Sequence, residues 1–95
     1  MAWKVIYHPD VQQDLTRLGS AAANRILDVI EERIRDGEPD KLGNPLRGAL
    51  SGCRRIRTGN TRIVYRVAAD AIHVLIIAVG ARRDEEVYNV AHRRV

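Results

Sequence analysis

The sequence predicts a small α+β fold with elements in the order β-α-α-β-β-β-α and a four-stranded, mainly antiparallel sheet. Two observations predict this fold. A segment of alternating residues around a Gly-Asn pair is typical of a β-hairpin, and two consecutive segments with apolar residues at helical spacing indicate a helical hairpin. A helical hairpin must bury its apolar side, and a sheet offers the surface. We therefore expect the helices to cover one face of the sheet and to leave the other face uncovered.

Length and composition limit the alternatives. The 95 residues are too few for two cores, so residues 1–95 should form one domain. The net charge of +4 favours an anionic partner. The single cysteine, Cys53, excludes a disulfide framework and has no zinc-ligand spacing around it. No segment reaches the ~18 consecutive apolar residues of a membrane span, and no signal peptide is recognisable. We expect a cytoplasmic protein with no membrane association.

The first predicted elements are a strand and a helix. Trp3–Tyr7 is rich in β-branched and aromatic residues and is followed by Pro9, which suits a first helical turn. The segment Asp10–Leu18 is then expected to be helical, because its apolar residues recur at i, i+4 and i+7. These residues are Val11, Leu15 and Leu18.

A second helix is predicted over Ala21–Arg35. Gly19 is expected to end the first helix, and Ser20 is a candidate N-cap for the second. The apolar residues of this second segment follow the helical period, while its charged residues take the other side. Gly37 is expected to end it. The apolar side consists of Ala23, Ile26, Leu27, Ile30 and Ile34.

The second half of the chain is predicted to supply most of the sheet. Gly37–Gly52, with four glycines and two prolines, reads as a long connection, and Cys53–Tyr65 reads as the β-hairpin. Ala71–Val79 is apolar on both faces, as expected of a central strand. Asp84–Arg94 is predicted to form a last helix. The residues expected to be mostly buried are Ile26, Ile30, Ile34, Ile63, Tyr65, Leu75 and Ile77.

The hairpin has one basic face. Residues of a strand alternate between faces, so Arg55 and Arg57 should lie on one side and Ile56 on the other. After the turn, Arg62 and Arg66 should share a face. Between residues 41 and 69 the chain holds seven basic residues and no acidic one. Such a face is either a solvated surface that discourages edge pairing or, as we favour, a binding surface for an anion.

A tyrosine and a histidine add groups that can transfer protons. Arg82 and Arg83 follow the predicted central strand, and Tyr88 and His92 share a face of the last helix at i, i+4. Tyr88 could instead pack as an anchor, and His92 could be an ordinary surface residue. If the anion is RNA, cleavage without a metal needs attack by the 2′-hydroxyl, neutralisation of the phosphorane and protonation of the leaving 5′-oxygen. Arginine is almost never neutral, so Tyr88 is the candidate for proton transfer.

With these motifs in this order, nearly the whole chain resembles the RelE/ParE toxin superfamily, in particular RelE-type messenger-RNA interferases. The resemblance is carried by PLRG at residues 45–48, CRRIR at 53–57, RIVYRV at 62–67 and VGARRDEEVY at 79–88. It implies the RelE-like fold and the toxin of a type II toxin-antitoxin system. The implied activity is endoribonuclease cleavage of messenger RNA in the ribosomal A site, without a metal or other cofactor.

The resemblance also assigns residues. It implies a catalytic set of Arg55, Arg57, Arg62, Arg82 and Tyr88. Arg55 and Arg57 stand where RelE carries paired lysines. RNA binding is assigned to the basic residues around this set, with His92 as a possible accessory residue and with no metal ligand. The RNA-binding residues are Lys41, Arg47, Arg54, Arg66 and Arg83.

The implied partners are a cognate antitoxin, messenger RNA on the ribosome, and operator DNA only through the toxin–antitoxin complex. Two other functions use the same fold. One is a ParE-like toxin that inhibits DNA gyrase, and the other is an interaction module whose basic face only holds an acidic antitoxin segment. Arg82 together with Tyr88 favours the ribonuclease.

Overall fold

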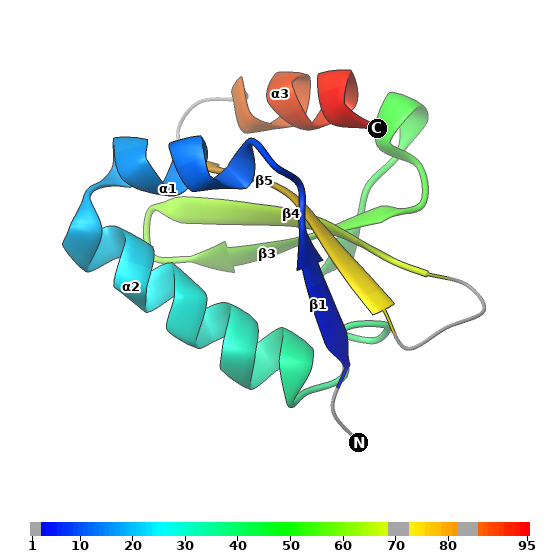
Figure 1. The fold of residues 1–95 in the computed structure, drawn as a ribbon. Helices are drawn as coiled ribbons and strands as arrows, with labels where there is room; N and C mark the ends of the chain where they lie inside the picture. The colour runs from blue at the N-terminus through cyan, green and yellow to red at the C-terminus, as the bar shows by residue number, and fades with distance from the viewer. Residues whose placement is uncertain (1–2, 69–72, 82–85) are drawn as a thin grey trace.

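The computed structural model describes residues 3–68, 73–81 and 86–95. Its strands and helices follow the predicted order, with two short elements added in the long connection (Figure 1). The elements are β1 (Lys4–Tyr7), α1 (Val11–Leu18), α2 (Ser20–Val29) with a π-helical continuation (Ile30–Arg35), β2 (Asn44–Pro45), a 3₁₀ turn (Gly48–Leu50), β3 (Cys53–Thr58), β4 (Thr61–Val67), β5 (His73–Ala81) and α3 (Glu86–Arg94).

The strands form one mixed sheet with the order β1-β5-β4-β3-β2. β1 runs parallel to β5, and the other neighbours are antiparallel. The α+β class and the antiparallel meander of the last three strands are therefore confirmed. The expectation of four strands is short by one, because the two residues of β2 pair with β3 at the sheet edge. So short a strand leaves no alternation to recognise in a sequence.

The predicted hairpin has the expected two-residue turn. Thr58 pairs with Thr61, and Gly59 between them has a φ of +55°, a conformation that glycine adopts at little cost. β4 and β5 pair along their length, with a register shift after Val64. This hairpin and β5 together form the centre of the sheet.

One face of the sheet carries the helical hairpin, as predicted. Gly19 joins the two helices with a φ of +90°. Ser20 is the first residue of α2 rather than its N-cap, so that expectation was wrong. The core on this face is formed by Val11, Ile26, Ile30, Ile34, Ile56, Ile63, Tyr65, Val74, Ile76 and Val79.

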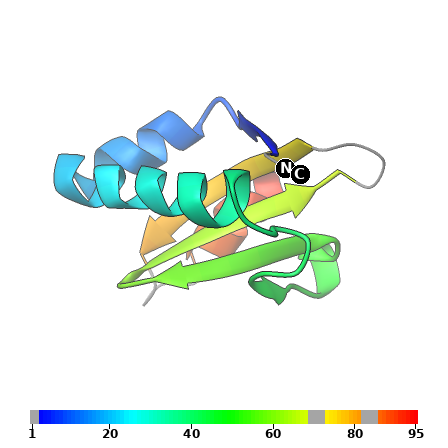
Figure 2. The ribbon, with the colours of Figure 1, turned by 90° about the horizontal axis from the view of Figure 1, so that it is seen from below.

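The other face of the sheet is covered by α3, so the expectation that helices lie on one face only was wrong. Figure 2 shows the helical hairpin and α3 on opposite sides of the strands. The physical reason is that the basic face also carries apolar residues. Because Val64 alternates with Ile63 and Tyr65, it faces the other way and needs its own cover. The second core cluster comprises Leu50, Cys53, Val64, Ala78, Val87 and Ala91.

The burial of the strands agrees with the prediction that β5 is central. Ile76 and Val79 belong to the core under the helical hairpin, and Ala78 belongs to the core under α3. Of the residues expected to be buried, five are buried and Leu75 is partly buried. Ile77 lies outside the described side chains. Within residues 3–68, 73–81 and 86–95, no helix has the length and apolar character needed to cross a membrane.

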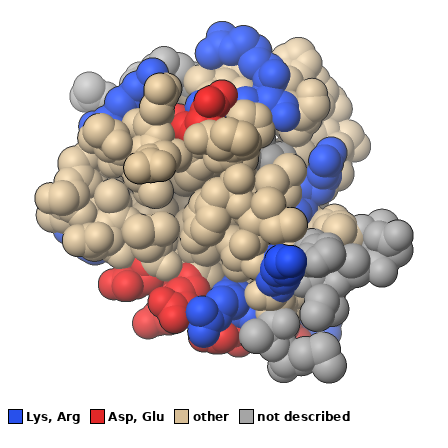
Figure 3. All heavy atoms as spheres, in the orientation of Figure 1, with Lys and Arg blue, Asp and Glu red and all other residues tan. Residues whose placement is uncertain are grey.

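Charge is distributed unevenly between the two faces. In Figure 3, which views the side that carries α1, α2 and β1, acidic side chains gather along α2. Much of that side is uncharged, with Ile6, Tyr7 and Leu27 among its exposed apolar residues. The arginines of the hairpin that alternate with its buried residues project on the α3 side. The guanidinium groups on the α3 side offer an anion a favourable electrostatic environment.

Candidate functional site

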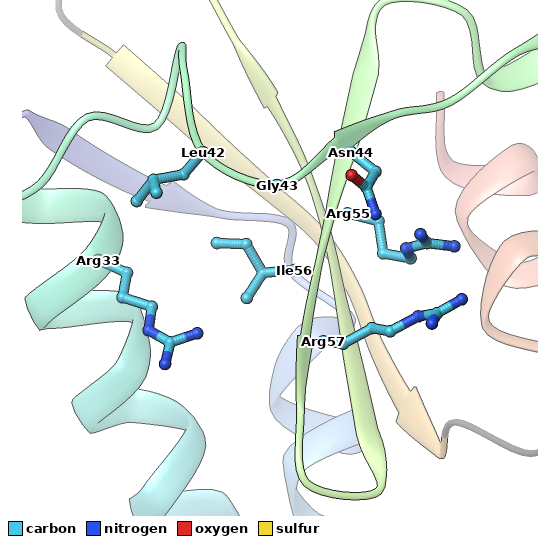
Figure 4. Close-up of a pocket in the computed structure, with 7 residues that line it drawn as sticks. All are labelled: Arg33, Leu42, Gly43, Asn44, Arg55, Ile56 and Arg57. Carbon is cyan, nitrogen blue, oxygen red and sulfur yellow. The ribbon is translucent and has the colours of Figure 1, made fainter.

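Three arginines of the hairpin project from the face that α3 covers. Arg57 of β3 lies directly opposite Arg62 of β4 in the register. Arg55 pairs with Val64, which is packed in the core under α3. In Figure 4 the side chains of Arg55 and Arg57 both extend to the α3 side of β3, whereas Ile56 points to the other side. The predicted alternation is confirmed.

Tyr88 of α3 meets two of these arginines. The Nη1 atom of Arg55 donates a hydrogen bond of 3.0 Å to the phenolic oxygen of Tyr88. The guanidinium carbon of Arg62 lies 5.1 Å from the centre of the Tyr88 ring, within cation–π distance. Residues from three separate elements thus form one cluster, which we call the Arg55–Arg62–Tyr88 cluster. Tyr88 is partly buried in it.

Gly80 lets the helix come this close. Arg62 lies opposite Gly80 in the sheet register, and Gly80 lies beneath Val87. A Cβ added at Gly80 would stand 2.9 Å from the Cβ of Val87, too close without a shift of the helix. The missing side chain at Gly80 therefore allows Val87 to sit directly on β5, which brings the neighbouring Tyr88 to Arg62.

The guanidinium groups of the cluster are not fully paired. The Nε atoms of Arg55 and Arg62 are buried and have no hydrogen-bond partner among the described residues. Neither arginine forms an ion pair with a carboxylate of the described residues. A buried unpaired donor costs about 1–3 kcal/mol, and two positive charges side by side repel each other. An anion bound at this face would relieve the repulsion, since guanidinium groups match phosphate oxygens well.

A shallow pocket of about 170 Å³ lies next to the cluster, on the outer edge of β3. Figure 4 shows its lining. Gly43 brings the connecting loop against β3, because a Cβ at Gly43 would stand 2.5 Å from the backbone oxygen of Arg55. Asn44 then pairs with Arg55 in the short strand β2. The lining residues are Arg33, Leu42, Gly43, Asn44, Arg55, Ile56 and Arg57, among which no residue is acidic.

Arg54 is not part of the cluster. It alternates with Arg55 and turns to the other face, where its Nε donates to the carbonyl oxygen of Leu42 at 2.8 Å. The Tyr65 hydroxyl lies 3.0 Å from the same oxygen and 2.9 Å from that of Pro39. Arg54 and Tyr65 therefore hold the connecting loop. Burial raises the pKa of the Tyr65 phenol more than nearby Arg54 lowers it.

The remaining predicted residues are more scattered. Arg66 pairs with Cys53 on the face of the cluster but is exposed. Lys41 is exposed in the loop and forms an ion pair with Glu38 at 3.4 Å. Arg47 is exposed just before the 3₁₀ turn whose Leu50 packs under α3. Burial raises the pKa of the Cys53 thiol, which favours its protonated, unreactive form.

His92 is exposed on α3, four residues after Tyr88. Arg82 and Arg83 lie outside the described residues. Within the described parts of the chain, no three His, Cys, Asp or Glu side chains come together in a way that could hold a metal ion.

Sequence reasoning missed a buried ion pair between α1 and α3. Asp14 of α1 is buried and accepts hydrogen bonds from Arg94 of α3. One signal was available, because Asp14 lies three residues after Val11 and one before Leu15, within the apolar stripe of the helix. Its partner lies 80 residues away, and no local pattern indicates that pairing.

Comparison with known proteins relates this chain to toxins of type II toxin-antitoxin systems. Residues 5–86 match a family model described as the ParE toxin of the type II toxin-antitoxin system parDE. The mRNA interferase toxin RelE of Escherichia coli K12 is 29% identical over 97 residues, covering 100% of this chain and 99% of that protein. The mRNA interferase RelE of Shigella flexneri has the same identity and coverage.

Solved structures agree with this similarity. The toxin–antitoxin complex RelBE2 of Mycobacterium tuberculosis contains a chain with a TM-score of 0.78 and 26% identity, covering 86% of this chain and 100% of that one. The E. coli toxin RelE, solved in the free state as a double arginine-to-alanine mutant, has a TM-score of 0.76 and 28% identity. The similarity covers 100% of this chain and 99% of that one. The overall fold is therefore shared with these toxins.

Proposed function

Since the chain belongs to the ParE toxin family of the RelE/ParE superfamily, we propose that it is the toxin of a type II toxin-antitoxin system and an endoribonuclease of the RelE type. Its substrate is messenger RNA in the ribosomal A site, and it acts in the cytoplasm. The observation that carries this proposal is the Arg55–Arg62–Tyr88 cluster, because it combines groups that bind phosphate with a group that transfers a proton.

The direction of one hydrogen bond supports the proposed role of Tyr88 as a proton donor. A guanidinium group only donates, so the Tyr88 oxygen accepts from Arg55 and its own proton points elsewhere. That proton is available to the leaving 5′-oxygen of an RNA chain. The 2′-oxygen forms a bond to phosphorus, the bond from phosphorus to the 5′-oxygen breaks, and Tyr88 protonates the departing oxygen. The products are a 2′,3′-cyclic phosphate and a 5′-hydroxyl.

Arginines serve the other half of the reaction. Charge accumulates on the phosphorane oxygens, and preorganised cations stabilise it at that moment. Arg57 and Arg62, opposite each other in the hairpin, are suited to this role. We extend the proposal to Arg82, which follows β5 in the sequence. The 2′-hydroxyl proton needs an acceptor that is not an arginine, and we propose His92, four residues after Tyr88 on α3, for that role.

We assign the surrounding basic residues to binding rather than chemistry. Arg66 is exposed on the sheet face that α3 covers, and Arg47 is exposed just before the 3₁₀ turn. Lys41 and Arg83 complete the proposed set. Arg54 is left out of this set, because its guanidinium is engaged with the loop carbonyls. Binding by several phosphate contacts is expected to weaken steeply with added salt.

The proposed protein partner is a cognate antitoxin. One of the similar structures is a toxin–antitoxin complex, and another pairs E. coli RelE with an antitoxin peptide. An antitoxin that covers the basic face, or displaces α3, would inactivate the cluster. Contact with operator DNA is proposed only through the antitoxin complex.

A second candidate function is inhibition of DNA gyrase, because the matching family model carries the ParE description. The two functions differ in what they require of Tyr88. Binding to gyrase needs a surface, whereas RNA cleavage needs the phenolic proton.

The test is to induce the toxin in cells and map the 5′ ends of cellular RNA, with a gyrase supercoiling assay on the purified protein. A Tyr88→Phe variant serves as the control. We expect new 5′ ends within coding regions that disappear in Tyr88→Phe, and unchanged supercoiling. Inhibited supercoiling without new RNA ends would contradict the ribonuclease proposal and support gyrase inhibition as the function.

A further inference from the structure

The carboxylate of Asp14 joins three elements. Arg94 of α3 binds it with two hydrogen bonds, from Nη1 to Oδ2 at 2.6 Å and from Nη2 to Oδ1 at 3.0 Å. The backbone N–H of Val79 in β5 donates to the same Oδ2 at 3.1 Å. Both side chains of the ion pair are shielded from solvent, at 4% exposed for Asp14 and 11% for Arg94. A bidentate pair of this kind fixes orientation as well as distance.

The helix held by this ion pair depends on such contacts. α3 has nine residues, and helices of that length are marginal on their own in water. Near its start, Val87 sits on Gly80, and Ala91 packs on the second core. At its end, Arg94 fixes the helix to α1 and β5. Tyr88 lies between these two attachments, so its place relative to Arg55 depends on both.

We propose that Asp14 and Arg94 are positioning residues for Tyr88: the buried ion pair holds α3 at the angle and depth that keep the phenolic oxygen within hydrogen-bond distance of Arg55. This inference rests on the proposed ribonuclease function. Neither residue touches the RNA. The ion pair acts through the helix, and a misplacement of about 1 Å by a distant change can lower a reaction rate about 10²-fold.

The first test compares two neighbouring arginines of α3. Arg94→Gln removes the ion pair, and Arg93→Gln removes an equal charge from the adjacent, exposed residue. The readouts are the single-turnover cleavage rate on programmed ribosomes, and affinity for the same ribosomes carrying RNA with a 2′-deoxy group at the cleavage position. We expect Arg94→Gln to lower the rate about 10- to 100-fold with affinity changed less than about 3-fold, and Arg93→Gln to leave the rate within about 2-fold. Equal rates in both variants would overturn the proposal.

A second comparison separates positioning from general damage. In a Tyr88→Phe background the proton donor is absent, so loss of the ion pair should lower the remaining rate less than about 2-fold. If Arg94→Gln lowered the rate by the same factor with and without the tyrosine hydroxyl, the ion pair would not act through Tyr88. Arg94→Lys, which keeps the charge but not the bidentate geometry, should recover part of the rate. Asp14→Asn provides the same test from the other partner.

A measurement on the free protein keeps this inference distinct from the proposed function. Amide hydrogen exchange in residues 87–92 should speed up in Arg94→Gln about 10-fold or more and stay unchanged in Arg93→Gln. Exchange that is the same in both variants overturns the anchoring, even if the wild type cleaves RNA. If the wild type fails to cleave RNA while this exchange difference is present, the ribonuclease proposal fails and the anchoring of α3 is upheld.

Discussion

Gly80 of β5 lies directly beneath Val87 of α3, so closely that a Cβ on Gly80 would stand 2.9 Å from the Cβ of Val87. This contact sets the distance between the helix and the sheet. Because Arg62 is the register partner of Gly80, the same contact determines whether the ring of Tyr88 lies over the Arg62 guanidinium.

Gly80→Ala should therefore impair cleavage. The added methyl group meets a β-branched side chain that cannot swing away, so the helix has to shift outward. We expect a fall of about 10- to 100-fold in the single-turnover rate in a protein that remains folded by circular dichroism. The double variant Gly80→Ala/Val87→Gly removes both the Cβ and the Cγ2 that the new methyl group would meet, and it should regain part of the lost rate. A double variant no better than Gly80→Ala would mean that this contact does not set the position of the helix.

Arg55 and Arg57 should behave differently although they lie on one face. Arg55→Ala removes the donor that orients the Tyr88 hydroxyl, so the rate is expected to fall about 10²-fold with a small loss of affinity. Arg57 is exposed and lies opposite Arg62 in the register of the hairpin. Arg57→Ala should lower the rate through lost stabilisation of the phosphorane, and it should also weaken RNA binding and lower the slope of log K against log salt by about 1. The measurement is RNA affinity across a salt series, and an identical slope in wild type and Arg57→Ala contradicts the assignment.

Gly43 should be more sensitive to substitution than Gly48. Both have positive φ, at +70° and +65°, so alanine strains the backbone at either position. At Gly48 the new Cβ meets open space, whereas at Gly43 it stands 2.5 Å from the backbone oxygen of Arg55. We expect Gly48→Ala to cost about 1 kcal/mol of unfolding free energy and Gly43→Ala about 3 kcal/mol or more. Denaturant unfolding measures both, and equal losses would show that the loop is free to move away from β3.

Tyr65 should make stability depend on alkaline pH. Its buried hydroxyl holds the connecting loop, so Tyr65→Phe should cost about 1–2 kcal/mol near neutral pH. Because burial raises the pKa of this phenol in the folded state, its contribution is fully present below the unfolded pKa of about 10 and is lost as pH rises through the folded pKa.

The check is the difference in unfolding free energy between wild type and Tyr65→Phe, measured from about pH 8 to pH 11.5. We expect this difference to shrink at the alkaline end, since only the wild type must keep this phenol protonated to stay folded. A difference that grows with pH would mean that the folded state stabilises the phenolate.

Strand alternation was enough to predict the basic face. The arginines at positions 55, 57 and 62 could be assigned to the opposite sheet face from Ile56 and Ile63, because side chains alternate along a strand and the turn has two residues. The cover over that face was not predicted. Val64 lies between Arg62 and Arg66 on its own strand face, and the packing of Val64 and Ala78 under α3 depends on residues far apart in sequence.

Other features could not be predicted from local sequence patterns, for the same reason. The partner of Asp14 is 80 residues away, and the importance of Gly80 appears only when Val87 is placed above it. The different role of Arg54 follows from its carbonyl partners in a loop that has no regular period. Sequence identifies which residues share a strand face, and tertiary contacts decide which of them meet.

The central claim is that Tyr88 donates a proton during RNA cleavage. The most direct measurement is single-turnover cleavage of messenger RNA on programmed ribosomes by wild type, Tyr88→Phe, His92→Ala and the double variant. We predict that Tyr88→Phe loses about 10²–10⁴-fold in rate with near-normal binding, because the ring still packs against Arg62. Full activity in Tyr88→Phe together with loss in His92→Ala would contradict the claim and assign the proton transfer to His92.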